Sequence, residues 1–134
     1  LYFSGGTGVD SVGQKVVDVI SGNDVVDFNR TIPQNNIGNG WYDIQPSDMG
    51  KHIYGYDFGC NLPWSVSETL PVGSYFYVVG GIDYDNYIQA TDEGVTLRHG
   101  NDSGSWIIGK NTIATVLKVD AYNWVIDGSN IWLD

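Results

Sequence analysis

The chain has 134 residues, a length that suits one domain with a single hydrophobic core. Six Lys and Arg stand against sixteen Asp and Glu, giving a formal net charge of −10, which repels nucleic-acid phosphates and anionic membrane surfaces. We therefore expect no nucleic-acid partner. Cys60 is the only cysteine, which excludes an intrachain disulfide and predicts a small, buried apolar residue.

The composition favours strands over helices. Eighteen glycines, nine tyrosines and five tryptophans, against one methionine, are typical of short strands joined by turns. We expect an all-β chain that folds as a small antiparallel β-sandwich or barrel of about 8–11 short strands. The apolar runs are shorter than the roughly 20 residues that cross a bilayer, so no membrane insertion is expected.

The N-terminal part divides into a short lead and a hairpin. Residues 1–5, Leu-Tyr-Phe-Ser-Gly, resemble the remnant of a protease-cleavable tag and are set aside. Residues 6–134 are expected to form a single β domain. Two β-branched runs on either side of residues 21–24 predict an N-terminal hairpin over residues 15–28.

A run of structure-breaking residues follows this hairpin. Residues 35–40, Asn-Asn-Ile-Gly-Asn-Gly, predict an ordered loop within the domain, with a linker as the alternative. The remaining module, 41–134, has turn residues at intervals of about ten, as in sandwiches and small barrels. Residues 112–119 have two partly apolar faces, which indicates a central strand. The expected strands lie near residues 41–44, 51–58, 64–66, 74–80, 86–90, 95–98, 105–108, 112–119, 123–127 and 130–133.

Three parts of this module carry a family resemblance. Residues 42–53 contain a tight Asp-x-Gly-Lys turn between two strands, and residues 70–79 contain a Pro-x-Gly turn before an apolar strand. The closing part, 94–98 and then 114–128, combines β-branched strands with an aromatic anchor. Their order and spacing over about residues 41 to 130 resemble a β-module of bacteriophage tail-fibre and virion-appendage proteins.

The resemblance implies a location on the virion, assembly as a homotrimer and a binding or structural role. It does not account for several aromatic residues or for the C-terminal tail, which are the places where a specific partner could be encoded. These departures from the family pattern are Tyr54, Tyr56, Trp64, Tyr84, Trp106 and residues 129–134.

No pattern in the chain predicts catalysis or metal binding. His52 and His99 are the only histidines, and the chain has no Cys cluster, His-Glu-x-x-His pattern or Gly-x-Ser-x-Gly elbow. The run from Asp83 begins like a calcium loop, but Ile88 stands where that loop needs glycine and Gly94 where it needs glutamate. We expect no catalytic residue, no metal and no cofactor. A small glycan hydrolase with carboxylates about 5–10 Å apart remains an alternative.

Two aromatic and polar runs are the best candidates for a ligand site. Sugar rings stack on Trp and Tyr, while Asp and Asn bind the hydroxyl groups. The alternative is that these aromatic residues fix loops onto the sheet. Trp124, between apolar neighbours in a strand, is expected in the core. The candidate ligand-binding residues are Tyr84, Asp85, Asn86, Tyr87, Asn101, Asp102 and Trp106.

These patterns lead to two hypotheses of different classes. The first is a non-enzymatic phage appendage module, tail-fibre or tip-like, that attaches to the host surface by binding a glycan receptor. The second is a structural capsid decoration or head-fibre protein that binds another virion structural protein. In the second case Ile131, Trp132 and Leu133 would supply an apolar anchor.

Overall fold

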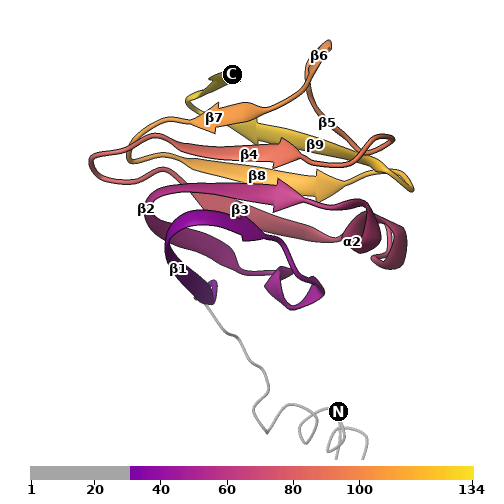
Figure 1. The fold of residues 1–134 in the computed structure, drawn as a ribbon, viewed down its shortest axis with the longest axis horizontal. Coiled ribbons are helices and arrows are strands. Elements are labelled where there is room, and N and C mark those ends of the chain that lie inside the picture. The colour runs from indigo at the N-terminus through magenta and orange to yellow at the C-terminus, as the bar shows by residue number, and fades with distance from the viewer. Residues whose placement is uncertain (1–30) are drawn as a thin grey trace, which may run out of the picture. The chain divides into compact units, whose positions relative to one another are not determined.

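The computed structural model describes residues 31–134. The expected tag remnant at 1–5 and the expected hairpin at 15–28 lie outside the described residues. Residues Pro33–Asp134 form one compact unit, and Figure 1 shows its strands running side by side, with the single short α-helix at one end.

The described residues form ten strands, one short 3-10 helix and one short α-helix. All ten strands join in one nearly closed, barrel-like sheet with the order β10-β7-β4-β2-β3-β8-β9-β5-β6, and β1 pairs with β2 beside this path. The expected all-β class is thereby confirmed. The elements are β1 Gln34–Asp43, η1 Pro46–Asp48, β2 His52–Leu62, α2 Trp64–Thr69, β3 Tyr75–Val79, β4 Asn86–Ala90, β5 Thr96–His99, β6 Asp102–Ser103, β7 Trp106–Ile108, β8 Ile113–Lys118, β9 Asn123–Gly128 and β10 Ile131–Leu133.

The strand pairing is mixed and not antiparallel throughout as expected, because three strands run parallel to the central strand β2. Five pairs are antiparallel, while β1, β3 and β4 all run parallel to β2, and β5 runs parallel to β9. The first residues of β2, His52 and Ile53, pair with β3, whereas its last part, residues 59–62, pairs with β4. β2 therefore passes from one half of the sheet to the other, with β1 alongside it.

The core follows the alternation of the strands. In β8, Ala114 and Val116 point inward while Ile113, Thr115 and Leu117 are exposed, and the strand lies between β3 and β9 as its two-faced pattern predicts. The fully buried large side chains include Trp124, Phe58, Phe76, Ile44, Ile53, Leu62, Ile88, Leu97, Ile108 and Ile126.

The core positions of Trp124 and Cys60 are confirmed. Trp124 meets Phe76 edge to face, with ring centroids 6.0 Å apart, and its indole N–H donates to Ser67 Oγ at 2.8 Å. Cys60 is fully buried, and this burial raises the pKa of its thiol well above the ordinary value. The thiol therefore stays protonated, and it packs as a small apolar side chain.

Two expectations about local structure are wrong. Residues 35–40, expected as a loop, belong to β1, because Gly38 and Gly40 adopt positive φ and absorb two register shifts while the strand pairs with β2. Residues 64–66, expected as a strand, begin α2. This helix follows Pro63 and ends at Thr69. The ammonium of the buried Lys118 donates to the carbonyl oxygens of Ser67 and of Leu70, the residue after the helix.

The environment of Lys118 gives a stability prediction. Its Nζ donates to Ser67 O at 2.5 Å and also to Leu70 O, and the residue is 3 % exposed. Lys118→Met keeps the aliphatic stem but leaves these carbonyls without their donor, so we expect a loss of about 2 kcal/mol in the free energy of unfolding. Urea denaturation measures it, with Lys110→Met, at an exposed position, as the control. Equal stability of the two variants would contradict this role.

Candidate functional site

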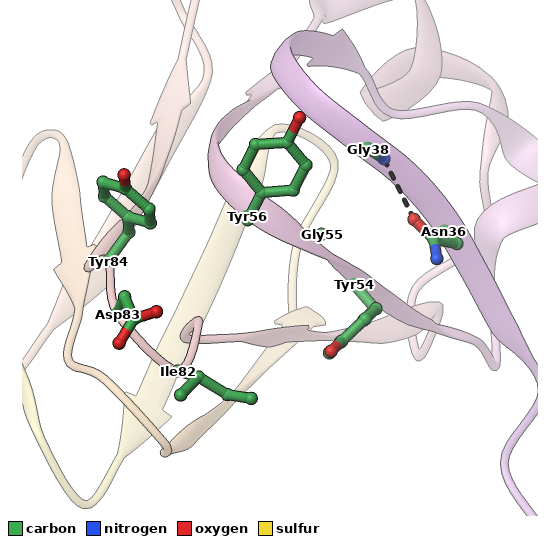
Figure 2. A pocket seen from close by; sticks show the side chains of 8 residues that line it. All are labelled: Asn36, Gly38, Tyr54, Gly55, Tyr56, Ile82, Asp83 and Tyr84. Atoms are coloured by element: carbon green, nitrogen blue, oxygen red, sulfur yellow. Dashed lines mark hydrogen bonds between the residues drawn. The ribbon is translucent and has the colours of Figure 1, made fainter.

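A hollow of about 350 Å³ opens on the surface between β1, β2 and the β3–β4 loop. Figure 2 shows how Tyr54 and Tyr56 of β2 and Tyr84 of the loop stand around it. Tyr56 is 58 % exposed and Tyr84 is 47 % exposed, so their rings are open to solvent. The other residues that line the hollow are Asn36, Gly38, Gly55, Ile82 and Asp83.

A second hollow, of about 310 Å³, lies further along the same two strands. Its exposed or half-buried aromatic residues are Trp41 of β1 and Tyr87 of β4, whose ring centroids are 6.4 Å apart. Trp41 is 60 % exposed, which is unusual for the largest apolar side chain. The remaining lining residues are Asn39, Gly40, Asp57, Phe58 and Gly59.

The two hollows adjoin one another along the chain. On β1 the lining passes from residues 36–38 in the first hollow to residues 39–41 in the second. On β2 it passes likewise from residues 54–56 to residues 57–59. We call the two together the aromatic groove, defined by Trp41, Tyr54, Tyr56, Tyr84 and Tyr87 with the carboxylates Asp57 and Asp83.

Two glycines of β2 make this surface possible. A Cβ on Gly55 would lie 2.3 Å from Gly38 O, so only glycine lets β1 approach β2 here. A Cβ on Gly59 would lie 2.3 Å from the Trp41 ring, which therefore rests directly on the β2 backbone. The indole is fixed from below and exposed above, as a stacking platform requires.

A buried polar cluster supports β1 next to the groove. Asp48 is fully buried and accepts hydrogen bonds from Tyr42 OH at 2.7 Å, Asn35 Nδ2 at 2.8 Å and Gln45 N at 2.8 Å. Every donor is supplied by the protein, so the carboxylate is satisfied within the fold. Burial and the hydrogen bond to Asp48 raise the pKa of Tyr42 to about 12.

Because of this cluster, the free energy of unfolding should fall as the pH rises into the alkaline range. A phenol with a raised pKa binds its proton more tightly in the folded state, so its contribution is complete below about pH 10 and is lost as pH rises through about 12. Cys60, whose pKa is raised by burial and by Asp48, adds a loss of the same sign. Tyr42→Phe should flatten the decline between pH 10 and 12 and lower stability at pH 7 by about 2 kcal/mol. Thermal denaturation across that range checks this, with Tyr84→Phe as the control; an unchanged slope in Tyr42→Phe would contradict it.

The structure separates the expected ligand residues of the first run. Tyr84 and Tyr87 line the groove. Asp85 accepts a hydrogen bond from Lys110 N at 3.1 Å. Asn86 is fully buried and lies where β2 leaves β3 and begins to pair with β4. Its side chain accepts a hydrogen bond from Phe58 N and donates one to Val79 O, both at 2.9 Å. Asn86 is therefore a structural residue and not a ligand residue, because its buried amide holds the backbone of two strands.

The second expected run does not reach the groove. Asn101 lies in the turn between β5 and β6, and Asp102 begins β6. Both are exposed, and neither lines the first or the second hollow. Trp106 is 3 % exposed, donates from Nε1 to Leu97 O at 3.0 Å and packs edge to face on His99. It cannot stack on a ligand, so its assignment as a ligand residue is corrected.

The sequence patterns did not indicate three groove residues, Trp41, Asp57 and Asp83. Trp41 directly follows the glycine-containing run that was expected as a loop, and its exposure depends on β1 pairing with β2. Asp57 has a φ of 50°, a left-handed conformation that aspartate tolerates better than most residues. The signal that did exist was the set of aromatic departures from the family pattern, which included Tyr54, Tyr56 and Tyr84.

The expected apolar anchor lies at an edge of the sheet. Among the strands of residues 31–134, β10 pairs with β7 alone. Ile131 is partly buried against the core, whereas Trp132 and Leu133 are 40 % and 43 % exposed. The side chains of Trp132 and Leu133 are thus exposed for contact with another protein.

Among residues 31–134, no group of three metal-ligating side chains gathers in one place. His52 contacts Gln34 through their side chains, and His99 lies 3.7 Å from Asp127. Each hollow of the groove is lined by one carboxylate, Asp83 in the first and Asp57 in the second.

No protein-family model, curated protein or solved structure matches this chain. Within the described residues, no helix is long and apolar enough to span a membrane.

Proposed function

We propose that this chain is a non-enzymatic attachment module of a phage virion appendage and that it binds a host-surface glycan in the aromatic groove. The observation that carries the proposal is the pair of adjoining hollows lined by five exposed or half-buried aromatic residues. Flat C–H faces of sugar rings stack on such side chains, and asparagine and aspartate beside them bind hydroxyl groups. The virion setting rests on the resemblance of residues 41–130 to tail-fibre modules.

The placement of the two carboxylates in different hollows favours binding over hydrolysis. Glycoside hydrolysis uses two carboxylates that flank one bond, whereas each hollow offers a single carboxylate. An open site of this kind holds a sugar weakly, with a Kd of about 1 mM, or about −4 kcal/mol. Assembly as a homotrimer would link several such sites, and linked sites gain a factor of about 10² to 10⁴.

The test is an array of bacterial surface polysaccharides probed with the purified chain. We expect saturable binding to a subset of the array, and we expect it to disappear in Tyr56→Ala combined with Tyr84→Ala. The control is Tyr75→Ala, which removes an exposed tyrosine on β3, outside both hollows. An array without any binder, or binding that survives the groove variant, would contradict the proposal.

A virion decoration protein is the second candidate, favoured by the exposed apolar residues of β10. Replacing Trp132 and Leu133 by serine leaves Ile131 in place against the core, so the strand should still pair with β7. Loss of virion docking in this variant, with glycan binding unchanged, would favour decoration. Loss of glycan binding alone in the groove variant would favour attachment.

A further inference from the structure

We infer that the aromatic groove selects glycans without acidic groups, meaning neutral or amino-bearing sugars, and rejects those that carry uronate, sialate or phosphate. The inference rests on the proposed function and narrows its ligand class. It is carried by two free carboxylates in the groove and by the absence of any cation lining it within the described residues.

The two carboxylates have no partner in residues 31–134. Asp83 lines the first hollow and Asp57 the second. Both are exposed, and neither accepts a hydrogen bond or forms an ion pair with another described residue. Other acids of the chain are used structurally, such as Asp48 in its buried cluster and Asp92, which accepts from Trp64 N at 2.6 Å. The groove carboxylates are therefore free to accept from a ligand.

The cations of the described residues lie elsewhere. Lys51, Arg98, Lys110 and Lys118 are the Lys and Arg of residues 31–134, and none of them lines either hollow. Lys118 is buried, and its ammonium donates to the carbonyl oxygens of Ser67 and Leu70. An acidic ligand would thus meet one carboxylate in either hollow, or both if it spans the groove, and no neutralising cation from residues 31–134. The formal net charge of the chain is already −10.

The same arrangement suits hydroxyl and ammonium donors. Hydrogen bonds from a hydroxyl to a carboxylate are stronger than those between neutral groups, and an ammonium adds a charge pair. Each like-charge contact near the surface costs about 1 kcal/mol at low ionic strength and less as salt screens it. Two such contacts correspond to a discrimination of about tenfold or more.

The polysaccharide array tests this inference when its members are grouped as acidic, neutral or amino-bearing. We expect neutral and amino-bearing members to bind and acidic ones not to bind at low salt. Tight binding of acidic members that is lost in Trp41→Ala would overturn the charge selection but leave glycan binding in the groove standing. An array with no binder would defeat the proposed function itself, and the selection with it.

A charge-neutral variant gives an independent readout. Replacing Asp57 and Asp83 together by asparagine preserves the size of both side chains and removes both charges, at exposed positions where folding should be unaffected. Isothermal titration with a neutral binder from the array and its uronate counterpart should show the acidic-to-neutral affinity ratio rising by about tenfold. An unchanged ratio would overturn the inference.

Discussion

Trp41→Ala should weaken glycan binding about thirtyfold, or by about 2 kcal/mol, because it removes the largest exposed aromatic surface of the groove. The fold should be little affected, since 60 % of the side chain is exposed. Isothermal titration with the best-binding glycan of the array measures the affinity, and thermal denaturation checks the fold.

Trp132→Ala is a matched control for this variant. It removes the same side chain type from β10, where Trp132 is also exposed but lines neither hollow. We expect its glycan affinity to stay within about twofold of the unaltered chain. An equal loss in both variants would show that the indole of Trp41 has no special part in binding.

Gly59→Ala tests the position of Trp41 without removing it. The added methyl group would lie 2.3 Å from the indole ring, so the exposed ring must shift away. We expect a loss of affinity approaching that of Trp41→Ala, together with a shifted tryptophan fluorescence spectrum. Normal affinity in Gly59→Ala would mean that the indole is not held in place for binding.

The second large effect concerns stability. Asn86→Ala should lower the free energy of unfolding by about 3 kcal/mol, because Phe58 N–H and Val79 C=O would be left buried without partners where the sheet splits. The variant should still unfold in a single transition, since the Asn86 amide joins β2 to the end of β3 and its loss weakens both strands together. Urea denaturation followed by tryptophan fluorescence measures the change.

Asn101→Ala serves as the control for Asn86. Asn101 is the other asparagine expected from the sequence to bind a ligand, but it is exposed, so its loss should change stability by less than about 0.5 kcal/mol. If Asn86→Ala were as stable as the unaltered chain and bound glycan more weakly, the original expectation of a ligand role would return.

The sequence predicts strands well where the residue pattern itself determines burial. In β8 the two partly apolar faces predict a central strand, and the strand lies between β3 and β9. β4 lies at the residues predicted, 86–90. The expectation failed at residues 35–40, because glycines and asparagines there signal a break while pairing with β2 makes them a bulged strand. Tertiary pairing overrides local propensity in such a segment.

The site was harder to predict than the fold for a related reason. Asn86 and Tyr87 are neighbours in one strand, yet the alternation of β4 buries the first and places the second in the groove. The sequence shows the residue types but not the register that separates them. Trp41 lies in the groove because β1 pairs with β2 and places its ring on Gly59, 18 positions away in the chain.

Binding of a glycan in the aromatic groove can be followed residue by residue in a nuclear magnetic resonance titration. Amide and indole signals of the chain would be followed as the best array glycan is added. We predict that the largest shifts fall on Trp41, Tyr56, Asp57 and Gly59. Shifts confined to the turn at Asn101 or to β10, with the groove signals unmoved, would contradict binding in the groove.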